Sequence, residues 1–261
     1  MESTHFVELQ DKGYTIVRNH LNQNEISEWK DLWPKIEKES LLSAKGIKKI
    51  KEPIYSDIFD DEGKPYVWKT QNSILRLDKG IETIEKYEKI LQRNINKNVR
   101  FVKDRFMNQK TNYLGHLPHQ DLATGCHRNI SDKWYTLYIS LTDTDVNSGC
   151  LWVEDITPKR TSRLGYCDEG CVNGKECLCT SIKVMPVDIK EYKGHNLIPI
   201  DLKAGDLIVF DGWLLHGTAC NLSNDTRQTL MFTYAQLREE DLDRDNVFDY
   251  YNKKFSEKKF N

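Results

Sequence analysis

The sequence predicts a mainly β domain with flanking helices, built as a closed antiparallel barrel or sandwich. Apolar residues recur with a period of two in short runs from residue 100 onward, which is typical of β-strands. Few helical stretches separate these runs, and this argues against a Rossmann sheet. The first part of the chain instead carries apolar residues at helical intervals. We therefore expect a mostly helical N-terminal support over 1–98 and a β core over 99–237.

The N-terminal support begins with a helix at 6–10, a break at Gly13 and a short strand at 14–17. Asn22 and Glu25 then have the spacing of a capping box and predict the start of a second helix. Helical spacing predicts a third helix, whose apolar stripe is Ile81, Ile84, Tyr87 and Leu91. Such stripes are typical of helices that pack on a sheet and carry no chemistry of their own.

The β core contains five runs that read as strands, at 100–107, 134–141, 197–200, 206–210 and 229–234. Along 134–141, one face combines Thr136 and Tyr138 with Trp134 and Ser140. This amphipathic face suits a barrel interior that holds a polar ligand, and it equally suits a half-exposed strand. The sequence leaves both interpretations open.

Two segments lack the strand pattern. Residues 155–195 have weak periodicity, and insertions of this length are typical of lids or binding loops. The insertion contains four cysteines, whose spacing is compatible either with a zinc site or with unligated thiols: Cys167, Cys171, Cys177 and Cys179. Residues 238–261 are charged with an apolar stripe and predict a C-terminal helix.

Composition excludes several classes of partner. The 261 residues include 38 Lys+Arg and 40 Asp+Glu, so no excess charge indicates a nucleic-acid or membrane partner. No apolar run approaches 18 residues, and the chain starts with polar residues. Seven cysteines, an odd number, favour reduced thiols over a disulfide framework. We expect a cytoplasmic protein whose partner is neither nucleic acid nor a membrane.

Candidate metal ligands occur at His119, Asp121 and His216. Residues two apart in an extended strand point to the same face, so His119 and Asp121 are expected to present an imidazole and a carboxylate together. A second imidazole from His216 would complete two nitrogens and one oxygen on one face of a metal. This ligand set is the facial triad of non-heme Fe(II) oxygenases.

Arg227 lies on the strand that follows a polar turn at 221–225. Its guanidinium can bind a carboxylate through two parallel hydrogen bonds. Gly205 and Asp206 form a turn that leads into the apolar strand before His216. These neighbours strengthen the interpretation of a metal site, because an isolated His-x-Asp is common.

Taken together, this arrangement resembles the phytanoyl-CoA dioxygenase-like family of Fe(II)/2-oxoglutarate oxygenases. The resemblance rests on the segment from Phe6 to Trp29, the Asn147–Leu151 turn, and the stretch from Gly205 to Arg227. It covers most of the chain and implies a single domain over 1–261, folded as a double-stranded β-helix, the jelly-roll or cupin-like barrel. The implied cofactors are Fe(II), 2-oxoglutarate as cosubstrate, and O2.

The resemblance also implies roles for individual residues. The triad would ligate Fe(II), and Arg227 would bind the distal carboxylate of 2-oxoglutarate with Thr218 as a hydroxyl neighbour. Asn108 and Lys110 are similar to a polar position of the family on the strand before the His-x-Asp pair. Three aromatic residues are candidates for lining the substrate pocket: Tyr138, Trp152 and Trp213.

The expected reaction is hydroxylation of an unactivated C–H bond of an amino acid, its derivative or a specialised metabolite, with release of succinate and CO2. Asp121 argues against halogenation, because halogenating relatives have a small residue in its place. After Trp152 the chain lacks the family's Pro-Gly-Ser-His turn and continues with Glu154 to Pro158. Two alternatives remain: a cupin-like metal enzyme that does not use 2-oxoglutarate, and a non-catalytic binding module.

Overall fold

The computed structural model describes residues 1–44, 54–55, 58–59, 65–112, 115–123, 131, 133–154, 191–192 and 195–239. Within these ranges the helices are α1 (Ser3–Lys12), α2 (Gln23–Ala44) and α3 (Asp78–Asn94), accompanied by the 3₁₀ turns η1 (Ile74–Arg76) and η2 (Asp121–Ala123). None of the described helices is both long and apolar enough to cross a membrane.

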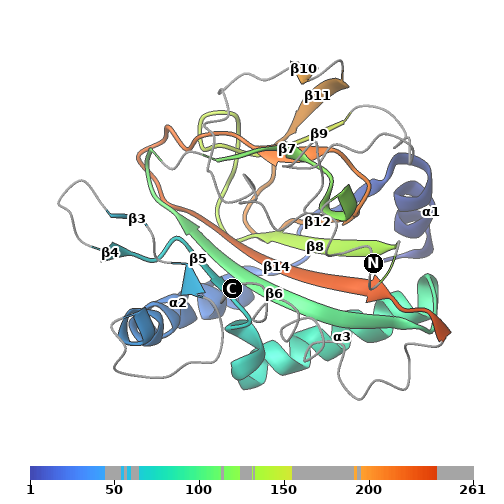
Figure 1. Ribbon diagram of the computed structural model, residues 1–261, viewed down its shortest axis with the longest axis horizontal. Coiled ribbons are helices and arrows are strands. Elements are labelled where there is room, and N and C mark those ends of the chain that lie inside the picture. The colour runs from blue at the N-terminus through green and yellow to red at the C-terminus, as the bar shows by residue number, and fades with distance from the viewer. Residues whose placement is uncertain are drawn as a thin grey trace, which may run out of the picture.

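Two antiparallel sheets form the body of the domain (Figure 1). In spatial order, the major sheet contains β1 (Tyr14–Val17), β12 (Leu207–Asp211), β8 (Trp134–Ser140), β14 (Arg227–Gln236), β6 (Val99–Gln109), β5 (Lys69–Gln71) and β2 (Ile54–Tyr55). The minor sheet contains β10 (Glu191–Tyr192), β11 (His195–Ile200), β9 (Leu151–Glu154), β13 (His216–Thr218) and β7 (His116–His119). A ribbon of β3 (Ile58–Phe59) and β4 (Pro65–Tyr66) stands apart.

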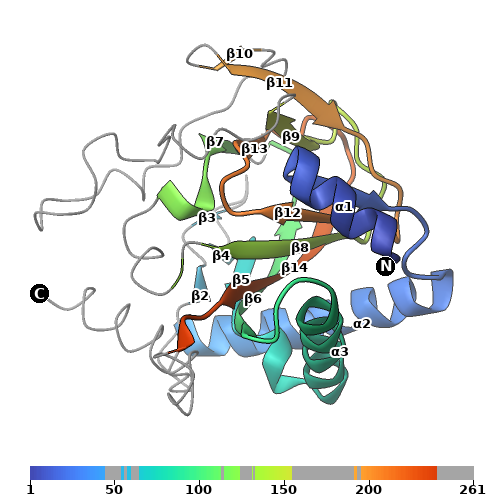
Figure 2. The ribbon, with the colours of Figure 1, turned by 90° about the vertical axis from the view of Figure 1, so that its right-hand side faces the viewer.

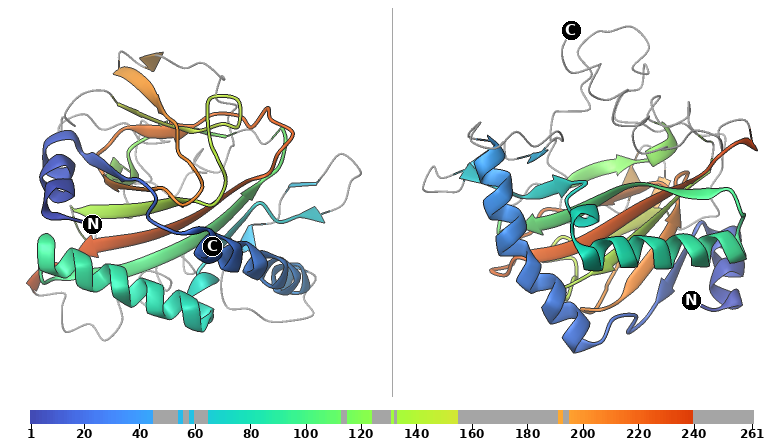
Figure 3. Two further views of the ribbon diagram at one scale, coloured as in Figure 1. Left: turned by 180° about the vertical axis from the view of Figure 1, so that it is seen from behind. Right: turned by 90° about the horizontal axis from the view of Figure 1, so that it is seen from below.

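The molecule has three layers, with the minor sheet facing the major sheet and α2 and α3 on the far side of the major sheet (Figures 2 and 3). The predicted mainly β architecture with flanking helices is confirmed. Within the described residues, however, the strands form two facing sheets and not one continuous hydrogen-bonded cylinder.

Strand alternation separates two apolar regions. Leu137 and Ile139 of β8 pack with Trp29 of α2 and Tyr87 of α3, in the layer between the major sheet and the helices. The opposite face of β8 places Tyr138 among apolar residues of both sheets. The amphipathic face predicted at 134–141 is therefore the face that lies between the sheets. Its polar side chains provide the environment in which a site can form.

The N-terminal elements follow their sequence signals. Gly13 ends α1 with φ 79°, the left-handed conformation that glycine adopts without a Cβ penalty. The backbone N–H of Asn22 donates to Glu25 over 2.9 Å, and that of Glu25 donates to the Asn22 side chain over 3.0 Å, so the predicted capping box is present. Of the stripe predicted for α3, Ile81 is 45% exposed and does not pack on the sheet.

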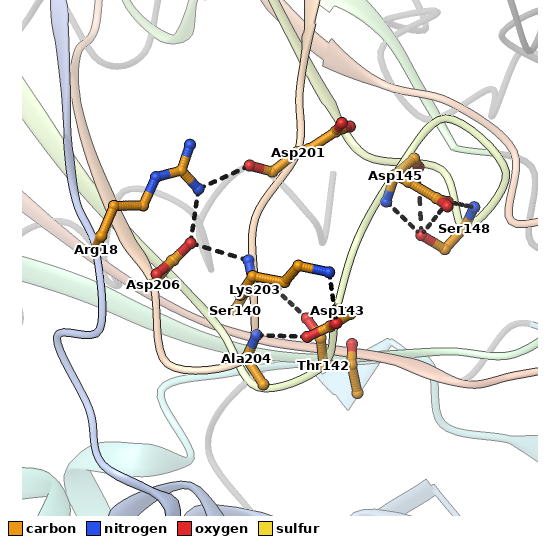
Figure 4. Close-up of polar contacts among 10 residues, drawn as sticks. All are labelled: Arg18, Ser140, Thr142, Asp143, Asp145, Ser148, Asp201, Lys203, Ala204 and Asp206. Carbon is orange, nitrogen blue, oxygen red and sulfur yellow. Dashed lines mark hydrogen bonds and ion pairs between the residues drawn. The ribbon is translucent and has the colours of Figure 1, made fainter.

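The turn before β12 is fixed by the buried carboxylate of Asp206 (Figure 4). Arg18 donates to Asp206 over 2.7 Å, and the backbone N–H of Lys203 donates to it over 2.9 Å. Gly205 in this turn has φ 93° and lies against the backbone of Leu21. The predicted turn thus ties the start of β12 to the N-terminal segment and sets the position of the strand that leads to His216.

Several predictions lie wholly or mainly outside the described residues. Of the insertion at 155–195, only residues 191–192 and 195 are described, and of the C-terminal helix at 238–261 only residues 238–239 are described. The four cysteines from Cys167 to Cys179 lie outside the described ranges as well. The lid, the zinc alternative and the terminal helix stay predictions.

Candidate metal centre and cosubstrate site

The three predicted metal ligands come together between the sheets. His119 is the last residue of β7, Asp121 begins η2, and His216 begins β13. The candidate ligand atoms of the three side chains all lie within 4.8 Å of one another. His119 and His216 face each other across the β7–β13 pair, with ring centroids 4.5 Å apart. Nε2 of His119 lies 3.8 Å from Oδ1 of Asp121.

The local geometry differs from the expected extended strand. β7 ends at His119, and Asp121 lies in the following 3₁₀ turn. The Asp121 carboxylate is therefore brought beside the His119 imidazole by this turn and not by strand alternation. This turn is held against the segment that leads to His216. The buried Gln120 amide donates to the carbonyl of Trp213 over 2.8 Å, and the N–H of Leu122 donates to the carbonyl of Gly212 over 3.0 Å. Both histidine-bearing segments are therefore fixed to each other.

Backbone carbonyls orient both imidazoles. Nδ1 of His119 lies 2.8 Å from the carbonyl oxygen of Leu117, and Nδ1 of His216 lies 3.0 Å from that of Leu214. A carbonyl oxygen only accepts hydrogen bonds, so each Nδ1 carries the proton and each Nε2 keeps its lone pair. Metal-ligating histidines are typically oriented in this way. The hydroxyl of Thr136 lies 3.4 Å from Oδ2 of Asp121.

Burial keeps the imidazole of His119 neutral. It lowers the pKa of His119 to about 3, and the charges of His216 and Arg105 act in the same direction. Burial also lowers the pKa of the neighbouring His116 well below its ordinary value, assisted by the charges of Lys69, Arg105 and Arg227. A neutral imidazole is the form that binds a metal. At neutral pH no proton must leave His119 before a metal binds.

Arg227 lies at the start of β14 and is 1% exposed. Its Nε donates to Oε1 of Gln109 over 2.7 Å, and its Nη2 donates to the same oxygen. Its Nη1 is buried and has no hydrogen-bond partner. Gln109 thus occupies the Nε–Nη2 edge of the guanidinium and leaves the Nη1–Nη2 edge available. A buried donor without a partner is costly, so this edge fits a bound carboxylate.

The polar turn before Arg227 is built around Asn221. This side chain is fully buried and donates to the carbonyls of Gln109 and Asp225, each over 2.9 Å. Thr218 lies in β13 two residues from His216, and its hydroxyl is 3.4 Å from Nδ1 of His116. The structure therefore places Thr218 on the same side of β13 as the triad.

Asn108 and Lys110 are not brought to Arg227. Asn108 accepts a hydrogen bond from Gln228 over 2.9 Å, on the face of the sheet opposite to Arg227. Lys110 is exposed, and its charge acts on Glu37 of α2. The polar residue of β6 that contacts Arg227 is Gln109, which the sequence interpretation missed by one position.

The three predicted pocket aromatics have different environments. Tyr138 is buried between the sheets with Val153 and Phe210. Trp213 packs beside Leu122 and Trp134, near the turn that carries Asp121. Trp152 lies on the opposite face of β9, where it pairs with Gly217 and packs with Leu197 and Leu215. Because His216 and Thr218 project to the other side of the minor sheet, Trp152 does not face the triad.

Comparison with known proteins gives a family and a fold. A family model described as phytanoyl-CoA dioxygenase (PhyH) matches residues 9–229. No curated protein matches the chain at a significant level.

Several solved structures of similar fold share between 13% and 15% of their residues with this chain. EvdO2 from Micromonospora carbonacea var. aurantiaca, in complex with 2-oxoglutarate, is 14% identical with a TM-score of 0.62, over 90% of each chain. SnoK, a non-heme α-ketoglutarate-dependent carbocyclase from nogalamycin biosynthesis, is 14% identical with a TM-score of 0.61, over 90% of this chain and 83% of its own. EctD from S. alaskensis, in its apo form, is 13% identical with a TM-score of 0.64, over 92% of this chain and 80% of its own. At these identities the likeness is one of fold.

Proposed function

The chain belongs to the phytanoyl-CoA dioxygenase family, and on that basis we propose that it hydroxylates an unactivated C–H bond of a small molecule in an Fe(II)- and 2-oxoglutarate-dependent reaction. One observation carries the proposal: the His119, Asp121 and His216 ligand atoms converge within 4.8 Å, on the side of the minor sheet that also carries Thr218. The partnerless Nη1 of the buried Arg227 supplies the anion site that the cosubstrate requires.

The donor set fits the two cofactors of the family. Two imidazoles and one carboxylate suit Fe(II) and leave positions open for other ligands. When both are bound, Fe(II) and 2-oxoglutarate supply the oxidising chemistry with O2 and release succinate and CO2. The residues of the chain bind and orient these groups. Arg227 would hold the distal carboxylate of 2-oxoglutarate, and Thr218 would offer a hydroxyl on the side of β13 that carries His216.

The packing around the triad restricts water. The ring of Phe210 lies 4.6 Å from that of His216, and Tyr138 and Leu214 pack in the same buried cluster. An apolar wall on one side of a metal site directs ligands and substrate to the remaining side. The substrate itself is expected to be an amino acid, its derivative or a specialised metabolite. Trp213 and Tyr138 are the aromatic candidates for its pocket.

The geometry favours this reaction over a cupin-like enzyme that does not use 2-oxoglutarate. In such an enzyme Arg227 would be a structural residue, and a structural arginine buried to 1% exposure would have its donors paired. The partnerless Nη1 is the observation that argues for a ligand. A non-catalytic binding module predicts that the triad residues can be replaced without loss of function.

Succinate release tests the proposal. The purified protein is supplied with Fe(II), 2-oxoglutarate and a panel of amino acids, amino-acid derivatives and small metabolites. We expect at least one compound to stimulate succinate formation, and the product to gain one oxygen atom. His216→Ala should abolish the activity. If succinate forms equally in the His216→Ala protein, or if turnover proceeds without 2-oxoglutarate, the proposed reaction is wrong.

A further inference from the structure

Arg105 carries a positive charge into the space between the sheets. It pairs with Met231 across the β6–β14 ladder, and paired residues project to the same side. Met231 packs against the cluster formed by Tyr138, Val153 and Phe210, which lies between the sheets. The Nε of Arg105 is buried and makes no hydrogen bond. None of the ion pairs among the described residues involves its guanidinium.

The buried carboxylates of the described chain are engaged elsewhere. Asp104 accepts the backbone N–H groups of residues 73–75, at the start of η1, on the helix side of the major sheet. Asp206 is paired with Arg18, and Glu154 is paired with His195. Arg105 is partly buried, and a charge partly withdrawn from water without a counter-ion is unfavourable. The planar fork of arginine matches the oxygens of a carboxylate or phosphate. The environment of Arg105 therefore calls for an anion supplied by a ligand.

The anion that Arg105 would bind is distinct from 2-oxoglutarate, because Arg105 and Arg227 lie at different positions along the major sheet. Gln109, which holds Arg227, lies four residues further along β6. At 3.3 Å per residue this spacing corresponds to about 13 Å along the strand. Arg105 nevertheless projects into the same space between the sheets in which the triad ligand atoms converge. Arg105 thus shares this space with the triad and is distant along β6 from the residue that anchors the cosubstrate arginine.

We propose that Arg105 binds an oxyanion carried by the organic substrate, either a carboxylate or a phosphate or sulfate ester, and thereby sets which C–H bond approaches the metal centre. The inference rests on the proposed function and narrows its substrate class. Lys103, two residues earlier, lies with its Nζ 5.3 Å from the centre of the Trp134 ring. Lys103 lies on the same face of β6 as Arg105.

The substrate class is tested by fractionation. Small molecules extracted from the source organism are separated on an anion-exchange resin, and each fraction is assayed for stimulated succinate release by the holoenzyme. We expect the stimulating compound in the retained fraction. Treatment of that fraction with phosphatase or sulfatase distinguishes the esters from a carboxylate, which should resist both. A stimulating compound found only in the unretained fraction overturns the inference and leaves the proposed function standing.

The role of Arg105 is tested by substitution. Arg105→Gln should raise the KM for the stimulating anion about 100-fold and leave the KM for 2-oxoglutarate unchanged, whereas Arg105→Lys should restore part of the loss. Arg100→Gln is the matched control, because Arg100 lies on the same strand and donates only to the carbonyls of Lys97 and Val99. A raised KM for 2-oxoglutarate with an unchanged KM for the anion overturns the inference.

A binding measurement keeps the inference testable without turnover. Calorimetric titration of the retained fraction's active compound into Mn(II)- and 2-oxoglutarate-loaded protein should give a binding signal that Arg105→Gln removes. Equal binding by both proteins overturns the inference. Absence of triad-dependent succinate formation under every condition would instead refute the proposed function.

Discussion

Replacement of Arg227 by alanine should separate cosubstrate binding from metal binding. Gln109 occupies one edge of the guanidinium and leaves the edge that includes the partnerless Nη1. That edge can donate two hydrogen bonds to a carboxylate, and a hydrogen bond to a charged group contributes about 1.5–3 kcal/mol. Allowing for non-additivity, we expect a loss of about 3–4 kcal/mol, which corresponds to an increase of roughly 10²–10³-fold in the KM for 2-oxoglutarate.

The assay is the initial rate of succinate release against the concentration of 2-oxoglutarate, with Mn(II) affinity measured in parallel by equilibrium dialysis. Metal affinity should be unchanged, because Arg227 lies outside the triad. Arg100→Ala is the control for the loss of a guanidinium, since the Arg100 side chain donates only to the backbone carbonyls of Lys97 and Val99. A fall in metal affinity with an unchanged KM for 2-oxoglutarate would refute the reasoning.

Three further predictions follow from particular contacts. Gln109→Leu should raise the KM for 2-oxoglutarate about tenfold, which corresponds to a loss of roughly 1.4 kcal/mol in binding, because Arg227 loses its only described side-chain acceptor. Metal affinity should stay unchanged. An unchanged KM in initial-rate assays would contradict this prediction. Asp104→Ala should lower the free energy of unfolding by about 3–5 kcal/mol in denaturant titration, because the N–H groups of residues 73–75 lose their acceptor. A loss below about 1 kcal/mol would show that water replaces the carboxylate. Burial, with a smaller contribution from the charge of Lys86, lowers the pKa of His20 from 6.5 to about 4, so the unfolded chain binds the proton first as pH falls. The stability that neutral His20 contributes is complete above pH 6.5 and is lost as pH falls toward 4. Because the ring is only partly buried, we expect the free energy of unfolding to fall by about 1–2 kcal/mol over this range. The measurement is the difference in the pH dependence of unfolding between wild type and His20→Gln, and identical profiles would refute the assignment.

The three residues of the triad could be predicted from the sequence because two of them are close neighbours and the third follows a recognisable strand. His119 and Asp121 are neighbours, and His216 follows an apolar strand with a glycine turn before it. Once β13 pairs with β7, both imidazoles must lie on one face. The turn conformation of Asp121 was not predictable in the same way. It depends on Gln120, whose amide bonds to a carbonyl 93 residues away in the chain.

Gln109 was missed because alternation along β6 is interrupted. The β6–β14 register shifts opposite Thr233 and Tyr234, so two successive residues, 102 and 103, lie opposite a single position. Counting from Phe101, which packs on the helix side, places Asn108 between the sheets and Gln109 against the helices. The bulge reverses that assignment for every later residue of the strand. No residue type in the sequence marks the bulge.

Trp152 illustrates a different limit. All four residues of β9 are buried, so both of its faces look alike in the sequence. Strand alternation shows that Trp152 points to the opposite face of β9 from Leu151 and Val153. Only the pairing of β9 with β13 shows which of the two faces carries His216. Fully buried strands hide the direction of their side chains.

The charges between the sheets connect the cosubstrate and the substrate. With both cofactors bound, the positive charges of Fe(II) and Arg227 are balanced by Asp121 and the dianionic 2-oxoglutarate. The guanidinium of Arg105 is outside this balance and projects from the same face of the major sheet as Arg227. A neutral substrate would leave it uncompensated in a partly buried position, which is unfavourable, whereas an anionic substrate would complete the balance. The same charge that would select an anionic substrate therefore disfavours the binding of a neutral competitor, and electrostatics contributes to specificity in addition to the shape of the pocket.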